Sequence, residues 1–229
     1  EHTDMVREAG IQSTTVDLDS FAFYNCFEHN YRPTEDESYA LVNMGAQVTN
    51  INIFSEGTSR FSRDIAVAGD AVTAAIESRL GVDFLEAEET KIREGLPEGG
   101  GAPLAAEETA FAGDGSLLDT IRGTVERITG EEAADDSPEG AAPDAAREQL
   151  GTLALEVRRS LQFYENQPGS RTIDRVVIGG GTAKTKNIES FLETEVGLPV
   201  ESIDPLRRVS PSGRGLDTEL VSDNRDRKS

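Results

Sequence analysis

The stretch LVNMGAQVTNINIF, residues 41–54, predicts two strands joined by a tight turn. Small and hydroxyl-bearing residues occupy the bend, and the return arm carries the apolar residues Val48, Ile51 and Ile53, as in a strand with one buried face. Gly45 lets the backbone turn where a Cβ atom would block a ligand. Because backbone N–H groups at such a bend can point at an anion, the stretch predicts a hairpin that faces phosphate.

The sequence after the hairpin predicts a third strand and then a helix. The pair Glu56-Gly57 is typical of a turn, and residues 60–67 would return the chain as the third strand of an antiparallel meander. Asp70 is a candidate N-cap for a helix that Gly81 would end. The apolar positions of this helix follow helical spacing: Val72, Ala75, Ile76 and Leu80.

A further helix is predicted from Asp83 to about Arg93. Asp83 and Glu86 have the spacing of a capping box, in which side chains satisfy the free N–H groups of the first turn. Glu88 and Lys91 lie one turn apart and can form an ion pair. Because charged residues on a helix usually face solvent, spacing alone favours a surface position for Lys91 over contact with a ligand.

Upstream of the hairpin, the pattern predicts two helices and a short strand. The first helix, residues 1–9, would end at Gly10, and residues 14–18 alternate as a strand does. Asp19 or Ser20 can cap the second helix. The aromatic side chains of that helix are interpreted as packing residues: Phe21, Phe23, Tyr24, Phe27 and Tyr31.

The composition changes between Leu96 and Ala146, where Gly, Pro, Ala, Glu and Asp predominate. The ends of this insert cannot bury enough apolar surface to offset the loss of chain entropy, so we expect them to be flexible. One island inside it, residues 116–129, has apolar residues at helical spacing. The longest helical pattern follows and runs from Ala145 to Gln167.

A second chemical signal is the run GGGT at residues 179–182. It follows a predicted buried strand, residues 173–178, and precedes a helix that would end at Gly197. Glycines at such a junction let a nucleotide approach the backbone closely. They also let a strand pack tightly against a helix, and the run matches neither a Walker loop nor a G-x-G-x-x-G fingerprint. Taken alone, the run leaves both interpretations open.

The chain is strongly acidic, with a formal net charge of −21 and a sequence pI of about 4.4. No basic stripe is present that could displace counterions from a phosphate backbone, which argues against nucleic acid as a partner. A solvated acidic surface explains the charge, and a specific basic partner is the alternative.

Few residues could support metal or nucleophilic chemistry. Cys26 is the single cysteine, and His2 and His29 are the only histidines. An internal disulfide is therefore impossible, and both a zinc site and a Ser/His/Asp arrangement are poorly supported. No apolar run reaches the roughly 20 residues that span a bilayer, and no signal peptide is apparent. These features predict a cytoplasmic protein.

The hairpin and the Gly-rich run occur in an order that resembles the actin-like ATPases. Residues 41–54 are similar to the second phosphate motif of that superfamily, and RVVIGGGTAKTKNIESFLE, residues 175–193, is similar to its adenosine motif. Within the superfamily, the chain resembles the PilM family of type IV pilus assembly proteins, which is related to FtsA. The other segments that carry this resemblance are VDLDSFAFYN (16–25), FSRDIAVAGDAVT (61–73), EAEETK (86–91) and EVRRSLQFY (156–164).

The resemblance implies an α/β chain with the actin-like (ribonuclease-H-like) fold. It implies mostly the second nucleotide-binding lobe with a small part of the first, as in an N-terminally truncated fragment. The implied domains are the end of the first lobe with its linking helix (1–36), the second lobe (37–95 and 147–210), the acidic flexible insert (96–146) and a disordered tail (211–229).

The resemblance also implies a site for ATP and Mg²⁺ in the cleft between lobes. The residues that it places there are Gly45, Ala46 and Thr49 at the β- and γ-phosphates, Glu88 and Lys91 near the ribose and base, and Gly180, Gly181 and Thr182 behind the adenosine. Members of the family hold the short cytoplasmic tail of the inner-membrane protein PilN, so a PilN-like tail and other pilus assembly proteins are the implied partners.

Asn43 departs from the superfamily pattern. Many actin-like ATPases carry Asp at this position, where the carboxylate helps to hold Mg²⁺ and the attacking water. Asn43 keeps an oxygen dipole without the charge, so we expect nucleotide binding with slow or absent hydrolysis and assign no catalytic residue. Because the hairpin lacks a carboxylate base, a structural adaptor is favoured over an actin-like phosphotransferase. An FtsA-like division protein is the nearest alternative, and it would need a C-terminal amphipathic membrane helix, whereas the tail of this sequence is polar.

Overall fold

The computed structural model describes residues 2–97 and 138–208. Within the described chain, contacts separate two units: residues 35–202, and residues 2–34 together with 203–208. The larger unit contains both the hairpin and the Gly-rich run. The predicted helical island at 116–129 and the predicted tail at 211–229 lie outside the described residues.

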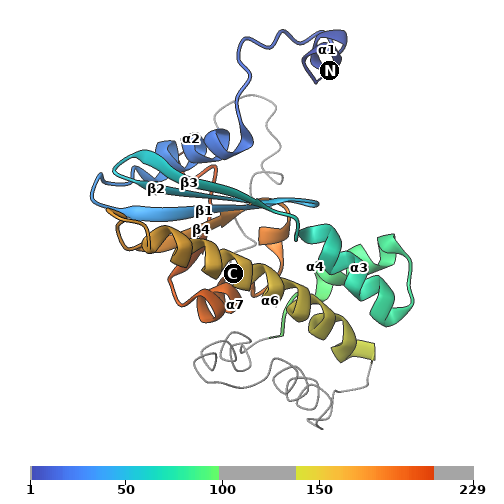
Figure 1. Ribbon diagram of the computed structural model, residues 1–229. Coiled ribbons are helices and arrows are strands. Elements are labelled where there is room, and N and C mark those ends of the chain that lie inside the picture. Colours follow the sequence, from blue (N-terminus) through green and yellow to red (C-terminus); the bar gives the residue numbers. More distant parts are fainter. Residues whose placement is uncertain (1, 98–137, 209–229) are drawn as a thin grey trace, which may run out of the picture. The chain divides into compact units, whose positions relative to one another are not determined.

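The larger unit is built on a five-stranded sheet in the order β3-β2-β1-β4-β5 (Figure 1). Its strands are β1 (Ser38–Met44), β2 (Thr49–Ser55), β3 (Thr58–Ile65), β4 (Arg175–Gly179) and β5 (Val200–Ser202). The first three strands form an antiparallel meander, whereas β4 runs parallel to both β1 and β5. The predicted hairpin, the third strand and the strand before the Gly-rich run are thus confirmed.

Among its described residues the larger unit has four helices, and a short 3-10 turn, η2 (Thr182–Lys184), follows β4. The helices are α3 (Gly69–Leu80), α4 (Phe84–Glu94), α6 (Pro138–Glu165) and α7 (Ile188–Val196). Figure 1 shows α6 lying along the sheet with α7 beside it, and α3 with α4 at one end of the sheet. Both α3 and α7 end at glycines in the left-handed conformation, Gly81 and Gly197, as predicted.

The hydrophobic core lies between α6 and one face of the sheet. Alternate residues of β1 and β2 point to this face because successive side chains of a strand alternate. The core includes Ala40, Val42, Met44, Ile51 and Ile53 from the sheet and Leu150, Leu153, Val157 and Leu161 from α6. Each fully buried aliphatic side chain contributes about 1.5–3 kcal/mol relative to an exposed one, so this stripe dominates the stability of the unit.

Helix α6 begins at Pro138, seven residues before the predicted start at Ala145. The acidic stretch 138–146, which we expected to be flexible, is therefore helical. Ala142, Ala145 and Ala146 are buried in the core, and this tertiary packing outweighs the composition of the segment.

Two predicted helix caps are wrong. Helix α3 begins at Gly69 with Ala68 at the N-cap position, and Asp70 supplies no capping hydrogen bond. Helix α2 (Asp19–Tyr31) begins with Leu18 at its N-cap and likewise has no side-chain cap. By contrast, Asp83 caps α4 by accepting a hydrogen bond from the Glu86 N–H at 3.0 Å, as the capping pattern predicts.

The smaller unit contains α1 (His2–Glu8) and α2. The predicted strand at residues 14–18 does not form: these residues have no strand partner, and Val16 and Leu18 are largely exposed. Of the predicted aromatic packing residues, Phe27 and Tyr31 stack with ring centroids 5.0 Å apart, whereas Phe21 is exposed.

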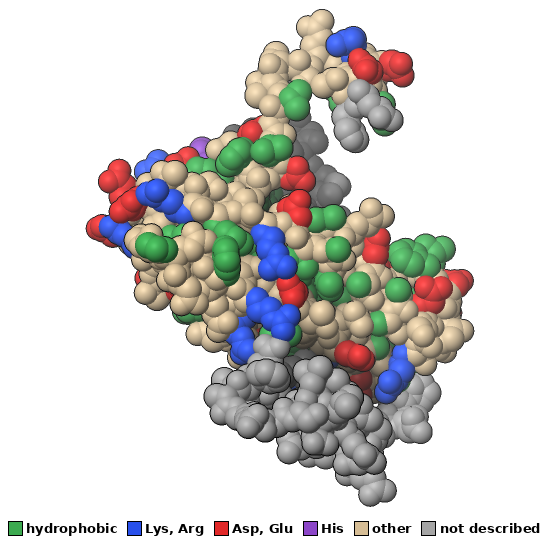
Figure 2. All heavy atoms as spheres, viewed as in Figure 1, with side chains coloured by type: hydrophobic (Ala, Val, Ile, Leu, Met, Phe, Trp, Pro, Cys, Tyr) green, Lys and Arg blue, Asp and Glu red, His purple; other side chains and the backbone are tan. Residues whose placement is uncertain are grey.

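Positive and negative side chains lie next to one another on the face of the larger unit seen in Figure 2. Glu156 of α6, for example, pairs with Arg63 of β3 at 2.8 Å and with Arg159 at 3.0 Å. Exposed ion pairs of this kind contribute about 0–1 kcal/mol each. These ion pairs therefore contribute little to the stability of the unit compared with its hydrophobic core.

Candidate functional site

The tip of the β1–β2 hairpin presents backbone donors to solvent. The Gly45 N–H donates to the Val48 carbonyl at 3.1 Å, and a Cβ atom at Gly45 would lie only 2.8 Å from that oxygen. The N–H groups of Ala46, Gln47 and Val48 donate to no acceptor among residues 2–97 and 138–208, and all three residues are exposed. Neighbouring N–H groups at a turn form a concave site that suits an oxyanion.

The start of α3 supports this tip from behind. The Gly69 N–H donates to the Gly45 carbonyl at 3.1 Å, and the Asp70 N–H donates to the Ala46 carbonyl at 2.7 Å. Two N–H groups that a helix start leaves without partners are therefore satisfied by the hairpin. A Cβ atom at Gly69 would lie 2.5 Å from Thr182 Oγ1 and 3.3 Å from the Gly45 oxygen, so the close approach requires glycine.

The Gly-rich run reaches the same point from β4. The Thr182 hydroxyl donates to the Gly45 carbonyl at 2.8 Å. Gly180 has a φ of +92°, and a Cβ atom there would press against the Met44 carbonyl and the Asn43 side chain. Gly181 has ordinary helical angles, and a Cβ atom there would meet no atom within 4 Å. Gly180 thus serves close packing, whereas Gly181 leaves its backbone open to approach.

Lys91 is buried, so the surface position favoured by spacing is wrong. Its side chain is 9% exposed, and Nζ lies 2.6 Å from Glu88 Oε2, 2.9 Å from Thr73 Oγ1 and 3.4 Å from the Gly69 oxygen. The predicted Glu88–Lys91 pair is confirmed. Through Thr73 and Gly69, this pair fastens α4 to the first turn of α3, which in turn supports the hairpin tip.

Thr49 and Asn43 complete the set of predicted site residues. The Thr49 side chain is fully buried, and its hydroxyl donates to the Val67 carbonyl at 2.9 Å. Asn43 is half-buried at the end of β1, and a Cβ atom at Gly180 would lie 2.8 Å from its Oδ1. The structure therefore gathers Asn43, Gly45, Ala46, Gly180 and Thr182 at one end of the sheet, whereas the Thr49 hydroxyl is directed at backbone.

Sequence reasoning did not include Gly69 or Thr73 among the site residues. Gly69 was visible as a glycine immediately before a helix, a position where a backbone often approaches closely. Thr73 lies beside the apolar stripe of α3, and no sequence signal showed that its hydroxyl would accept a hydrogen bond from Lys91 and donate one to Glu88. Only the packing of α3 against α4 reveals that role.

The ionisation of Glu88 makes the stability of this region depend on pH. Partial burial by itself would raise the pKa of Glu88, but hydrogen bonds from Lys91 and Thr73 hold the pKa below the ordinary value of 4.5. A group with a depressed folded-state pKa stabilises the fold above its unfolded pKa, and this contribution is lost as the pH falls through the folded value.

We therefore expect the free energy of unfolding to fall more steeply below pH 4.5 in the wild type than in Glu88→Gln, with parallel curves between pH 5 and 7. Urea denaturation across this pH series measures the effect. Glu89→Gln, an exposed change on the same helix, is the matched control and should follow the wild type. Equal acid slopes for the wild type and Glu88→Gln would contradict the assignment.

Comparison with known proteins identifies the family. The family model described as type IV pilus assembly protein PilM matches residues 1–102 and 128–226. The chain belongs to this family.

Solved structures similar to the PilM-family chain share its fold at low sequence identity. A chain of a PilM–PilN type IV pilus biogenesis complex is 22% identical with a TM-score of 0.65, and the match covers 95% of this chain and 51% of that one. The ethanolamine utilization protein EutJ from Carboxydothermus hydrogenoformans is 17% identical with a TM-score of 0.56, covering 90% and 56%. MreB 5 of Spiroplasma citri bound to AMPPNP is 15% identical with a TM-score of 0.51, covering 95% and 69%.

These similarities confirm the predicted actin-like fold. The PilM-family chain spans about half the length of the first two matched chains. Within its described residues, no group of three or more His, Cys, Asp or Glu side chains is arranged to hold a metal ion, and no helix has the length and apolar character needed to cross a membrane.

Proposed function

We propose that this PilM-family chain is the nucleotide-binding part of a cytoplasmic structural adaptor in type IV pilus assembly. ATP with Mg²⁺ binds at the hairpin tip and the Gly-rich turn, and it is hydrolysed slowly or not at all. One observation carries the proposal: the three tip N–H groups that donate to no described acceptor and the open backbone of Gly181 belong to motifs that meet at the Gly45 carbonyl oxygen.

The residues present fit this ligand. The N–H groups of Ala46 and Gln47 suit phosphate oxygens, because they are exposed and donate to no described acceptor. The flat backbone of Gly180 and Gly181 suits the ribose and base. Mg²⁺, when bound, would neutralise phosphate charge, and Asn43 is the residue that would offer a side-chain oxygen to its hydration shell.

Glu88 and Lys91 have a positioning role in this proposal. The Lys91 ammonium is satisfied within the protein by Glu88, Thr73 and Gly69, so its effect on the nucleotide passes through the first turn of α3. Thr182 acts in the same way by orienting the Gly45 peptide. Thr49 fixes the chain before α3 through its bond to Val67.

The partner is proposed to be the cytoplasmic tail of a PilN-like inner-membrane protein, which would place the adaptor at the membrane through its partner. Membership of the PilM family and similarity to a chain of a PilM–PilN complex support this proposal. Such an adaptor would offer partners a different surface with and without nucleotide, because a ligand shifts the populations of conformations that bind it unequally.

Titration calorimetry of the full-length protein with ATP and Mg²⁺ is expected to show binding. Gly181→Ala should weaken that binding roughly tenfold or more, because the new methyl group enters the space in which the ligand lies, while stability is unchanged. Gly197→Ala is the opposite control: with a φ of +78° it should lose stability yet bind ATP normally. Absence of heat from a folded wild type would reject the nucleotide site.

Asn43→Asp is expected to raise ATP hydrolysis by roughly tenfold or more, because it supplies the carboxylate that Asn43 lacks. Phosphate release measured at saturating ATP and Mg²⁺ tests this. Asn50→Asp on the neighbouring strand is the matched control, since Asn50 contacts Asp64 instead. Steady wild-type turnover at several per second would refute slow hydrolysis.

A further inference from the structure

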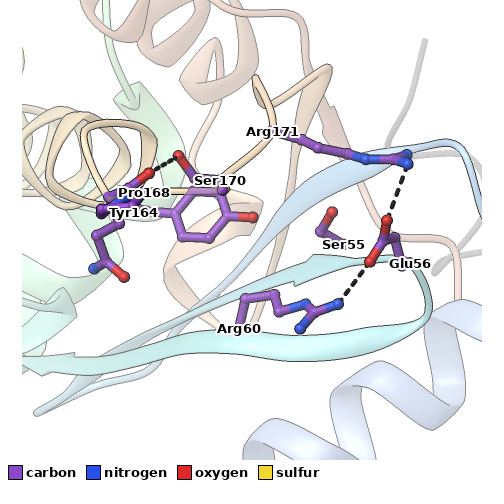
Figure 3. Close-up of a pocket in the computed structure, with 9 residues that line it drawn as sticks. Ser55, Glu56, Arg60, Tyr164, Pro168, Ser170 and Arg171 are labelled. Atoms are coloured by element: carbon purple, nitrogen blue, oxygen red, sulfur yellow. Dashed lines mark hydrogen bonds and ion pairs between the residues drawn. The ribbon is translucent and has the colours of Figure 1, made fainter.

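A polar cavity lies at the end of β2 that is opposite the hairpin tip. Its volume is about 340 Å³, and it is enclosed by the β2–β3 turn, the last turns of α6 and the loop that follows α6 (Figure 3). The lining residues are Ser55, Glu56, Arg60, Tyr164, Gln167, Pro168, Gly169, Ser170 and Arg171. Since β2 has seven residues, the cavity is separated from the hairpin tip by about 20 Å of strand.

Two guanidinium groups in this cavity share one carboxylate. Arg60 Nη2 lies 2.7 Å from Glu56 Oε2, and Arg171 Nη2 lies 2.9 Å from Glu56 Oε1 (Figure 3). Each arginine side chain is 44% exposed. Arg171 also reaches the Asp36 carbonyl at 3.4 Å, but the Nε and Nη1 groups of Arg60 and the Nε group of Arg171 have no acceptor among the described residues. The cavity therefore holds unused cationic donors.

Tyr164 adds a buried donor. The residue is only 4% exposed, and its hydroxyl makes no hydrogen bond to any described residue. In Figure 3 the ring extends from α6 and points this hydroxyl toward Ser55 and Glu56. The hydroxyl oxygen is not fully enclosed, so it is open to the cavity and can donate a hydrogen bond to a polar group that enters it.

The backbone of Glu56 is unusual for this residue type. Glu56 and Gly57 have φ values of +55° and +66°, which is the conformation of a two-residue type I′ hairpin turn. Gly, Asn and Asp are the usual residues at the first position of such a turn. A longer side chain there normally makes no contact that offsets the steric cost of the left-handed backbone conformation. Here the side chain gains two arginine contacts, and its carboxylate shows how an acidic group fits the cavity.

We propose that this cavity binds the Asp or Glu side chain of a partner protein. The incoming carboxylate accepts hydrogen bonds from the Tyr164 hydroxyl and from the N–H groups of Arg60 and Arg171 that Glu56 does not use. The guanidinium fork matches a carboxylate in geometry, and the half-exposed arginines leave the rest of the partner segment in solvent. The inference does not depend on nucleotide binding.

Charge explains why an acidic segment would dock here and not elsewhere. The chain carries a net charge of −21, so most of its surface repels acidic partners. At this cavity two arginines face Glu56, and the exposed Asp36 carboxylate lies 4.0 Å from Arg171 Nη1, so the charges balance and this point of the surface is not negative. Specificity then arises because the acidic surface repels an acidic segment, whereas the unused N–H groups of this cavity attract its carboxylate.

The test titrates the full chain with the peptide Ac-Gly-Glu-Glu-Gly-NH₂. Binding is measured by NMR from the shifts of the arginine side-chain N–H signals. Glu56→Gln should tighten binding roughly tenfold, because it removes the competing carboxylate and leaves both arginines in place. Tyr164→Phe should weaken binding about fivefold without changing stability, since it removes only the unpartnered hydroxyl.

Arg60→Ala with Arg171→Ala should abolish binding, whereas Arg79→Ala, an exposed change on α3, should leave it unchanged. Parallel titrations with Ac-Gly-Gln-Gln-Gly-NH₂ and with inorganic phosphate distinguish carboxylate recognition from general polar or anion binding. The proposal is overturned if Glu56→Gln binds no peptide, if the glutamine peptide or phosphate binds as well as the glutamate peptide, or if Tyr164→Phe and the double arginine variant bind like the wild type.

Discussion

Gly180→Ala is expected to lower the free energy of unfolding by about 2–5 kcal/mol, because two costs add at this position. The φ of +92° is unfavourable for any residue with a Cβ atom. The new methyl group would also press against the Met44 carbonyl and lie 2.8 Å from Asn43 Oδ1. The carbonyl belongs to a strand in the middle of the sheet and cannot move aside without disturbing the hairpin.

Chemical denaturation of Gly180→Ala measures this loss. Gly81→Ala is the matched control, because Gly81 has a φ of +66° and a Cβ atom there would meet no atom within 4 Å. It should carry only the backbone cost of about 1–2 kcal/mol. If the two variants lost equal stability, the close contact between the Gly-rich turn and β1 would add nothing to the cost of Gly180→Ala.

Lys91→Met is expected to cost about 2–3 kcal/mol. Removing one partner of a buried ion pair usually costs about 3–5 kcal/mol, but the Glu88 side chain is 36% exposed and water can satisfy part of its charge. The Thr73 hydroxyl and the Gly69 carbonyl also lose the ammonium that contacts them. The first turn of α3 should consequently become less protected in amide hydrogen exchange.

Arg93→Met is the control for Lys91→Met, since Arg93 lies on the same helix, is 65% exposed and pairs only with its neighbours. It should change stability by less than about 0.5 kcal/mol. Adding Glu88→Gln to Lys91→Met should recover part of the loss, because it removes the uncompensated carboxylate. A Lys91→Met variant as stable as Arg93→Met would show that the pair does not hold α4 to α3.

The elements that the sequence predicted correctly are those with strong local signals. The β1–β2 hairpin follows from a glycine at a bend between apolar strands, and the glycines after α3 and α7 adopt the left-handed conformation that ends a helix. The order of the hairpin and the Gly-rich run indicated the actin-like fold. That inference came from the resemblance of these two motifs to those of the actin-like superfamily, and neither motif alone was specific.

The elements that sequence reasoning missed depend on distant partners. Residues 14–18 alternate like a strand but have no neighbouring strand to complete their hydrogen bonds. The first turns of α6 have the composition of a linker, yet three alanines there are small enough to pack into the core. Lys91 has the spacing of a surface residue, and it is buried because α4 packs against α3, where its ammonium contacts Gly69 and Thr73.

The orientation of the peptide groups at the hairpin tip has a consequence for signalling. The carbonyl of Gly45 and the N–H of Ala46 belong to one peptide group, as do the carbonyl of Ala46 and the N–H of Gln47. In both groups the N–H faces solvent, whereas the oxygen accepts a bond from the first residues of α3. An anion that accepts hydrogen bonds from these N–H groups polarises both peptide groups and shifts electron density toward their oxygens, which strengthens the hydrogen bonds that those oxygens accept. We therefore expect a bound anion to strengthen the hydrogen bonds between the hairpin tip and the start of α3 even without a movement of atoms.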